Sequence, residues 1–131
     1  MDISPDCLEW VAKAEEDRRA AELLHASGDA TFGAIICFHC QQSAEKYLKA
    51  ALVQARVDFP KTHDFGELVI LCKTVAADFE RLKPPTSLLQ KYAVDPRCPG
   101  FAPDAATVTA AMDAMREVRT FCRGHLGLEE S

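Results

Sequence analysis

The apolar residues of this chain recur at steps of three and four over long stretches, and no stretch shows the sustained apolar–polar alternation of a half-buried strand. The pattern predicts helices over residues 5–27, 30–55, 64–82 and 104–124, with a short helix at 86–93. We therefore expect an all-α fold, an antiparallel four-helix up-and-down bundle with one short extra helix. With 131 residues and no internal repeat, the chain is expected to form one helical domain over 1–131.

Local signals mark the ends of these helices. Ser4 is a good N-cap, and Pro5 is tolerated at a first helical position. Asp64, followed three residues later by Glu67, reads as a capping box. We expect Pro84 and the proline after it to stop the third helix, and residues 94–103, with three prolines and a glycine, to form an irregular loop.

Composition places the chain among folded proteins, because 48% of its residues are hydrophobic and 27% are charged. No apolar run approaches the roughly 18–20 residues of a membrane helix, and the acidic start of the chain lacks the order of a signal peptide. We therefore expect a cytoplasmic protein that does not enter a membrane. The net charge of −5 argues against non-specific DNA binding, and the six cysteines are expected to stay reduced.

Polar residues concentrate on the second helix. At 100° per residue, a sector of about 120° contains His39, Gln42, Glu45, Lys46 and Lys49. This sector is either a solvated helix face or the lining of a groove or partner interface. Two further polar residues occupy positions where an apolar residue is expected. Gln41 lies on the core side and needs hydrogen-bond partners, and Asp17 completes the apolar stripe of the first helix.

Two loops carry further candidates. His63 precedes the third helix, whose N-terminus favours anions, so it either packs over the capping residues Thr62 and Asp64 or faces a phosphate or a buried carboxylate. Tyr92 and Arg97 flank the proline-rich loop. Arg97 suits recognition of a carboxylate or phosphate, or forms a structural ion pair with Asp17 or Glu45.

The sequence contains only weak candidates for a metal site or for a ribonuclease motif. Cys37 and Cys40 are one helical turn apart, but zinc needs about four ligands and no second pair follows, so we expect no metal and no cofactor. Metal-independent ribonucleases use an Arg and a His four to six residues apart. Three of the four histidines have an Arg at about that distance, so the spacing carries little information. Arg119 and His125 are the best of these pairs as catalytic candidates.

Several of these residues together resemble the HEPN domain family. The run QQSAEKYLKA at residues 41–50 resembles the family signature, and Lys61-Thr62-His63-Asp64 is similar to its Thr-His-Asp element. Tyr92 followed by Arg97-Cys98-Pro99 resembles its late Tyr…Arg-Tyr-Pro element, with Cys98 in place of the usual Tyr. Trp10, Ala14 and Asp17 match its first helix, so the likeness extends over about residues 8–123.

The resemblance implies a helical bundle that dimerises and binds a nucleotide, RNA or a minimal nucleotidyltransferase partner, in several relatives as a toxin–antitoxin pair. We therefore expect a module without catalysis of its own. The alternatives are a ribonuclease toxin that cleaves RNA and a purely structural dimeric subunit. The residues that the resemblance assigns to ligand binding are Lys46, Lys49, His63, Tyr92 and Arg97, with Asp17, Gln41, Gln42 and Glu45 as supporting polar groups.

Overall fold

The computed structural model describes residues 2–93 and 100–129, which contain helices and no strand. The expected all-helical fold is confirmed for these residues. The α-helices are α1 (Pro5–Ala26), α2 (Gly33–Gln54), α3 (Phe65–Val75), α4 (Lys83–Gln90) and α5 (Ala105–Leu126), and two 3₁₀ helices, η1 (Ala30–Phe32) and η2 (Ala77–Leu82), connect them. No helix among the described residues combines the length and the apolar content needed to cross a membrane.

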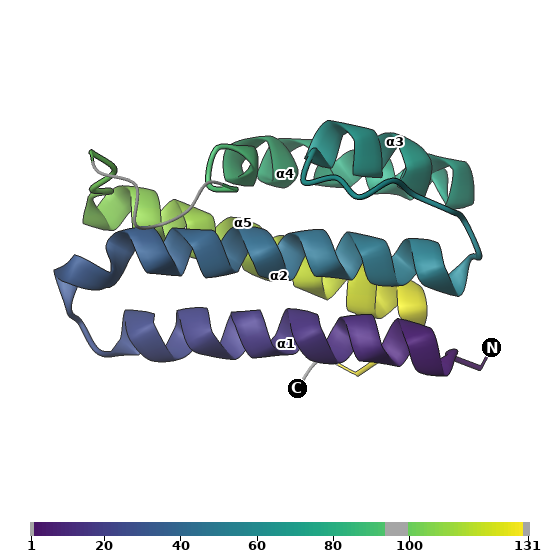
Figure 1. The fold of residues 1–131 in the computed structure, drawn as a ribbon, viewed down its shortest axis with the longest axis horizontal. Coiled ribbons are helices and arrows are strands. Elements are labelled where there is room, and N and C mark those ends of the chain that lie inside the picture. The colour runs from purple at the N-terminus through teal and green to yellow at the C-terminus, as the bar shows by residue number, and fades with distance from the viewer. Residues whose placement is uncertain (1, 94–99, 130–131) are drawn as a thin grey trace.

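Helix α2 is the centre of the fold. It packs against α1 on one side and against α5, α3 and α4 on the others, and α3 and α4 lie on the side away from α1 (Figure 1). The side chains of Tyr47, Leu48 and Leu52 on α2 are fully buried. Met112 of α5 is also fully buried, and Phe65 of α3 is almost fully buried. Each such side chain stabilises the fold by about 1.5–3 kcal/mol through its removal from water.

The arrangement departs from the expected four-helix up-and-down bundle after α2. Residues 55–64 run back along α2, because His63 contacts Glu45 in the middle of that helix. Helix α3 then proceeds in the same general direction as α2, since Cys72 further along α3 reaches the carbonyl of Leu48. Consecutive long helices therefore do not simply alternate in direction.

The third predicted helix is divided in two. Helix α3 ends at Val75, Ala76 is extended at φ −154° and ψ 126°, and a 3₁₀ helix follows. A 3₁₀ helix has three residues per turn, so Phe79 and Leu82 share one face, and both are buried. The expectation that Pro84 stops a helix is wrong: α4 begins at Lys83, and its prolines occupy the first turn, where the missing N–H groups are not needed.

The helix ends follow ordinary capping chemistry. Ser4 Oγ accepts a hydrogen bond from the backbone N–H of Cys7, and Asp64 Oδ1 accepts from the N–H of Gly66, so both predicted N-caps are confirmed. Helix α5 continues past the predicted end at Gly124 to Leu126, and Gly127 terminates it in the left-handed conformation at φ 74°.

Candidate functional site

Glu45, in the middle of α2, is the centre of the first polar cluster. Its side chain is buried, and its carboxylate accepts hydrogen bonds from Gln41 Nε2 at 2.9 Å, from Lys49 Nζ at 3.0 Å and from His63 Nδ1 at 2.9 Å. The carbonyl of Gln41 in turn accepts from Gln42 Nε2 at 2.7 Å. The buried amide of Gln41, expected to need partners, is therefore bonded at both its nitrogen and its oxygen.

Lys49 is enclosed by aromatic rings as well as by its ion pair. Its Nζ lies 5.7 Å from the ring centre of Trp10 on α1 and 5.8 Å from that of Phe59 in the returning loop. The two rings meet edge to face at 6.1 Å. These contacts leave only 9% of the Lys49 side chain exposed, so this ammonium serves mainly to balance Glu45.

His63 is the exposed member of this cluster. Its side chain is 67% exposed, and with Nδ1 held by Glu45 the other ring nitrogen, Nε2, is left for other contacts. The loop around it is fixed by Gln90 of α4, which donates to the carbonyl of His63 and accepts from the N–H of Phe65. Thr62 accepts from the N–H of Asp64. Thr62 and Asp64 are therefore capping residues, and His63 faces a buried carboxylate, Glu45.

A second cluster is centred on Asp17 of α1. Its Oδ1 accepts from His39 Nδ1 at 2.8 Å and its Oδ2 accepts from Lys46 Nζ at 2.5 Å. Burial raises the pKa of Asp17, but the hydrogen bonds and charges of His39 and Lys46 outweigh that effect and leave the pKa below its usual value. The carboxylate inside the apolar stripe of α1 is thus ionised and paired with α2.

The two clusters lie on different sides of α2. Glu45 and Lys46 are consecutive residues, so their side chains leave the helix about 100° apart. Lys46 reaches α1, whereas Glu45 reaches the loop before α3. The structure therefore brings Lys49 and His63 together on Glu45 and places Lys46 on Asp17 with His39, a residue of the predicted polar sector that the resemblance did not assign to the site.

Tyr92 and Arg97 do not extend these clusters. Tyr92 is buried, and its ring stacks on Phe101 with centroids 5.5 Å apart. Burial, followed by the neighbouring Cys37 and Asp104, raises the pKa of its hydroxyl. Arg97 lies outside the described residues. Asp17 and Glu45, its two suggested ion-pair partners, are each already bound to a lysine.

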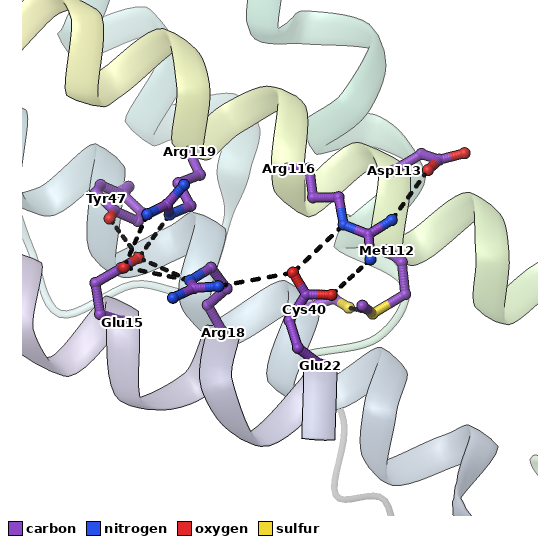
Figure 2. Close-up of polar contacts among 9 residues, drawn as sticks. All are labelled: Glu15, Arg18, Glu22, Cys40, Tyr47, Met112, Asp113, Arg116 and Arg119. Atoms are coloured by element: carbon purple, nitrogen blue, oxygen red, sulfur yellow. Dashed lines mark hydrogen bonds and ion pairs between the residues drawn. The ribbon is translucent and has the colours of Figure 1, made fainter. Parts of the chain in front are cut away.

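A third polar network, which the sequence did not predict, joins α1 to α5 (Figure 2). Glu15 accepts two hydrogen bonds from Arg119, at 2.8 and 3.0 Å, one from the hydroxyl of Tyr47 at 2.6 Å and one from Arg18 at 3.2 Å. Burial raises the pKa of Glu15, but Arg119, Tyr47 and Arg18 together lower it to about 2. Burial and Glu15 raise the pKa of Tyr47 to about 12, against the effect of Arg123.

The network continues along the same seam. Arg18 also contacts Glu22, and Glu22 accepts a hydrogen bond from Arg116 at 2.5 Å, while Arg116 also lies 3.5 Å from Asp113 (Figure 2). Arg116, Arg119 and Arg123 recur at steps of three and four and so lie close to one face of α5. This spacing indicates a basic stripe, but it does not reveal the carboxylates that neutralise it.

Arg119 and His125 do not share a site. The Arg119 guanidinium is directed toward Glu15 on α1, and its side chain is 10% exposed. The ring of His125 lies against Phe79 of η2, with centroids 4.9 Å apart. Six residues of helix place the two side chains about 120° apart. This chain alone therefore does not bring the two ribonuclease candidates together.

The described cysteines are packing residues. Cys7, Cys37, Cys40, Cys72 and Cys122 are free and buried, and Cys40 Sγ lies 3.5 Å from Met112 Sδ (Figure 2). No group of three or more His, Cys, Asp or Glu side chains suited to a metal ion occurs in the described part of the chain. Burial raises the pKa of these thiols, which keeps them protonated.

Comparison with known proteins gives one match. The family model of the HEPN domain matches residues 7–125, which is most of the chain. Neither a curated protein nor a solved structure matches it. The matched range includes the Glu45 and Asp17 clusters and the α1–α5 network.

Proposed function

Because this chain belongs to the HEPN domain family, we propose that it is a cytoplasmic, non-catalytic module that binds a nucleotide or RNA through a phosphate and works beside a minimal nucleotidyltransferase, as in a toxin–antitoxin pair. We propose that it acts as a homodimer. We propose two phosphate-binding positions on different sides of α2: His63, with Lys49 behind it, in the Glu45 cluster, and Lys46 in the Asp17 cluster.

One observation carries this proposal: two buried carboxylates, Asp17 of α1 and Glu45 of α2, each bind one lysine and one histidine, and each histidine is held at Nδ1. A histidine held at Nδ1 has a fixed ring orientation and keeps Nε2 for a ligand. The exposed fractions are 67% for the His63 side chain and 25% for Lys46. The carboxylates thus orient the basic groups, and protonated His63 would add positive charge at the surface where a phosphate would bind.

The test is calorimetric titration of the purified chain with ATP, GTP and a short RNA. His63→Ala and Lys46→Met should each weaken binding by about tenfold, the effect expected from losing one charge-assisted hydrogen bond. Lys13→Met is the matched control, since Lys13 is 67% exposed on α1 and pairs only with Glu16 at 3.5 Å among the described residues. Absence of heat with all three ligands, or equal binding by every variant, contradicts the proposal.

The partner is tested separately. If a small nucleotidyltransferase is encoded in the neighbouring reading frame, the two chains should co-purify when expressed together. If the nucleotidyltransferase remains unbound when this chain is present in excess at micromolar concentration, the pairing is contradicted. This result leaves the phosphate site untouched, so the two parts of the proposal stand or fall independently.

A second function is favoured by the ion pairs within the Asp17 and Glu45 clusters. Lys46 and Lys49 already have carboxylate partners, as a purely structural dimeric subunit requires. In that case Lys46→Met lowers the free energy of unfolding, because Asp17 loses a partner, and no ligand heat appears with wild type. Unfolding in urea, measured beside the titrations, separates the two functions.

A further inference from the structure

A groove of about 610 Å³ lies between η2 and the C-terminal half of α5, and no residue of the Asp17 or Glu45 cluster lines it. On the η2 side it is lined by Asp78 and Arg81, among others. Arg81 lies 5.7 Å over the ring of Phe121, and the ring of Phe79 meets that of Phe121 edge to face at 5.0 Å. The groove is therefore lined by one aromatic ring, Phe121, which the buried Phe79 supports, and by charged side chains.

The α5 wall has a regular order. Glu117, Phe121 and His125 follow one another at steps of four, so they form one stripe along the helix. Beside them, Gly124 faces the groove, and a Cβ built there meets no atom within 4 Å. A glycine inside a helix costs about 1 kcal/mol relative to alanine, and it leaves room for another backbone to approach closely.

The charges of this groove have both signs. Asp78 and Glu117 are acidic, Arg81 is basic and His125 can carry a proton. Within residues 2–93 and 100–129, neither Glu117 nor Arg81 forms an ion pair. A small ion of a single sign would leave half of these groups unmatched, whereas a partner surface with the same mixture matches them.

From this order we propose that the groove is the contact surface for a second copy of this chain, packed α5 against α5 in antiparallel orientation. The stripe reads Glu–Phe–His at equal steps, so a twofold axis at Phe121 places Glu117 of one copy opposite His125 of the other. The Glu117–His125 contact is then made twice, once on each side of the axis. The proposal rests on the homodimer in the proposed function and names its surface.

Sedimentation equilibrium tests the surface directly. Wild type should sediment at twice the chain mass of 14.4 kDa. Gly124→Gln places a neutral, bulky side chain in the groove and should raise the dimer Kd by about tenfold or more. At a protein concentration low enough to dissociate the wild-type dimer, the variant should have a melting temperature no lower than that of wild type. The reason is that its Cβ enters open space in the single chain and glutamine favours helix.

Two further variants complete the test. Ala106→Gln adds the same side chain at an exposed position on the first turns of α5 and should sediment as wild type. Glu117→Lys should weaken the dimer, because it opposes a cation to His125 of the second copy, and the added change His125→Glu should restore it by reversing both charges.

The proposal is overturned if wild type is monomeric at high concentration, if Gly124→Gln remains fully dimeric, or if the double charge reversal stays as weak as Glu117→Lys. Ligand titration of Gly124→Gln distinguishes this failure from that of the phosphate site. His63 and Lys46 belong to other surfaces, so nucleotide binding should persist whether or not the dimer forms.

Discussion

Arg119 of α5 binds Glu15 of α1 through two of its nitrogens, with Nε at 2.8 Å and an Nη at 3.0 Å from the two carboxylate oxygens. The residues are 104 positions apart in the sequence. Because both side chains are largely buried, each charge depends on the other. This pair, with Tyr47 beside it, closes the seam between the first and last helices.

Replacement of the carboxylate should therefore destabilise the fold strongly. Glu15→Gln leaves the Arg119 guanidinium without its counter-charge and should lower the free energy of unfolding by about 3 kcal/mol. Urea unfolding followed by circular dichroism measures this difference. Glu16→Gln is the control: Glu16 is exposed, pairs only with Lys13 among the described residues, and should change stability by less than about 0.5 kcal/mol. Equal losses in both variants would show that the α1–α5 pair is not stabilising.

The same carboxylate predicts a pH dependence. The pKa of Glu15 is about 2 in the folded chain and usually near 4.5, so its ionised form is favoured by folding. The resulting stability is present above about pH 4.5 and is lost as the pH falls toward 2, by at most about 3 kcal/mol. Unfolding measured at a series of pH values should show this loss in wild type. The curve for Glu15→Gln should be flatter in the same range, and parallel curves contradict the assignment.

The Glu45 cluster should hold the returning loop in place. Glu45→Gln removes the charge that binds Lys49 and His63, so residues 57–63 should exchange their amide hydrogens faster. Hydrogen–deuterium exchange with mass spectrometry resolves this segment. Glu67→Gln changes an exposed carboxylate in the first turn of α3 and serves as the control. Unchanged exchange in Glu45→Gln would mean that Gln90 alone fixes the loop.

Two glycines should respond in opposite ways to the same substitution. A Cβ at Gly33 would lie 3.1 Å from Pro103 Cγ and 3.2 Å from the Pro103 carbonyl oxygen, so Gly33→Ala should cost about 1–2 kcal/mol. Gly124→Ala enters open space within a helix of the single chain and, at a protein concentration at which the chain is monomeric, should stabilise by up to about 1 kcal/mol. Thermal unfolding of wild type and both variants measures these differences in stability. A stabilised Gly33→Ala variant would show that the segment around Pro103 moves away from residue 33 easily.

The buried thiols should be unreactive in the native state. Burial raises the pKa of Cys37 to about 11 and that of Cys72 to about 12, and Cys7, Cys40 and Cys122 are raised as well. Labelling with an aromatic disulfide reagent at pH 8, followed by peptide mapping, should leave these five unmodified until urea is added. Rapid native labelling of any of them would reveal a local opening of the helix that carries it.

Some features could be predicted from the sequence because they depend on neighbours along the chain. The caps at Ser4 and Asp64 follow from the residue types at helix starts. The need of Gln41 for partners follows from its place on the core side of α2. The division of the third helix at Ala76 could not be predicted, because no breaker stands there. It results from the burial of Phe79 and Leu82 against other elements.

The sequence by itself determined that this chain is helical, where α1, α3 and α5 begin, and that α2 carries an unusual set of polar groups. The reason is that helix periodicity and capping act over only a few residues. Only the tertiary structure decided which charges meet. It divided Lys46 and Lys49 between Asp17 and Glu45, and it joined Glu15 to Arg119 across the chain. The physical reason is that ion pairing depends on distance in space, which helix packing sets and local sequence does not.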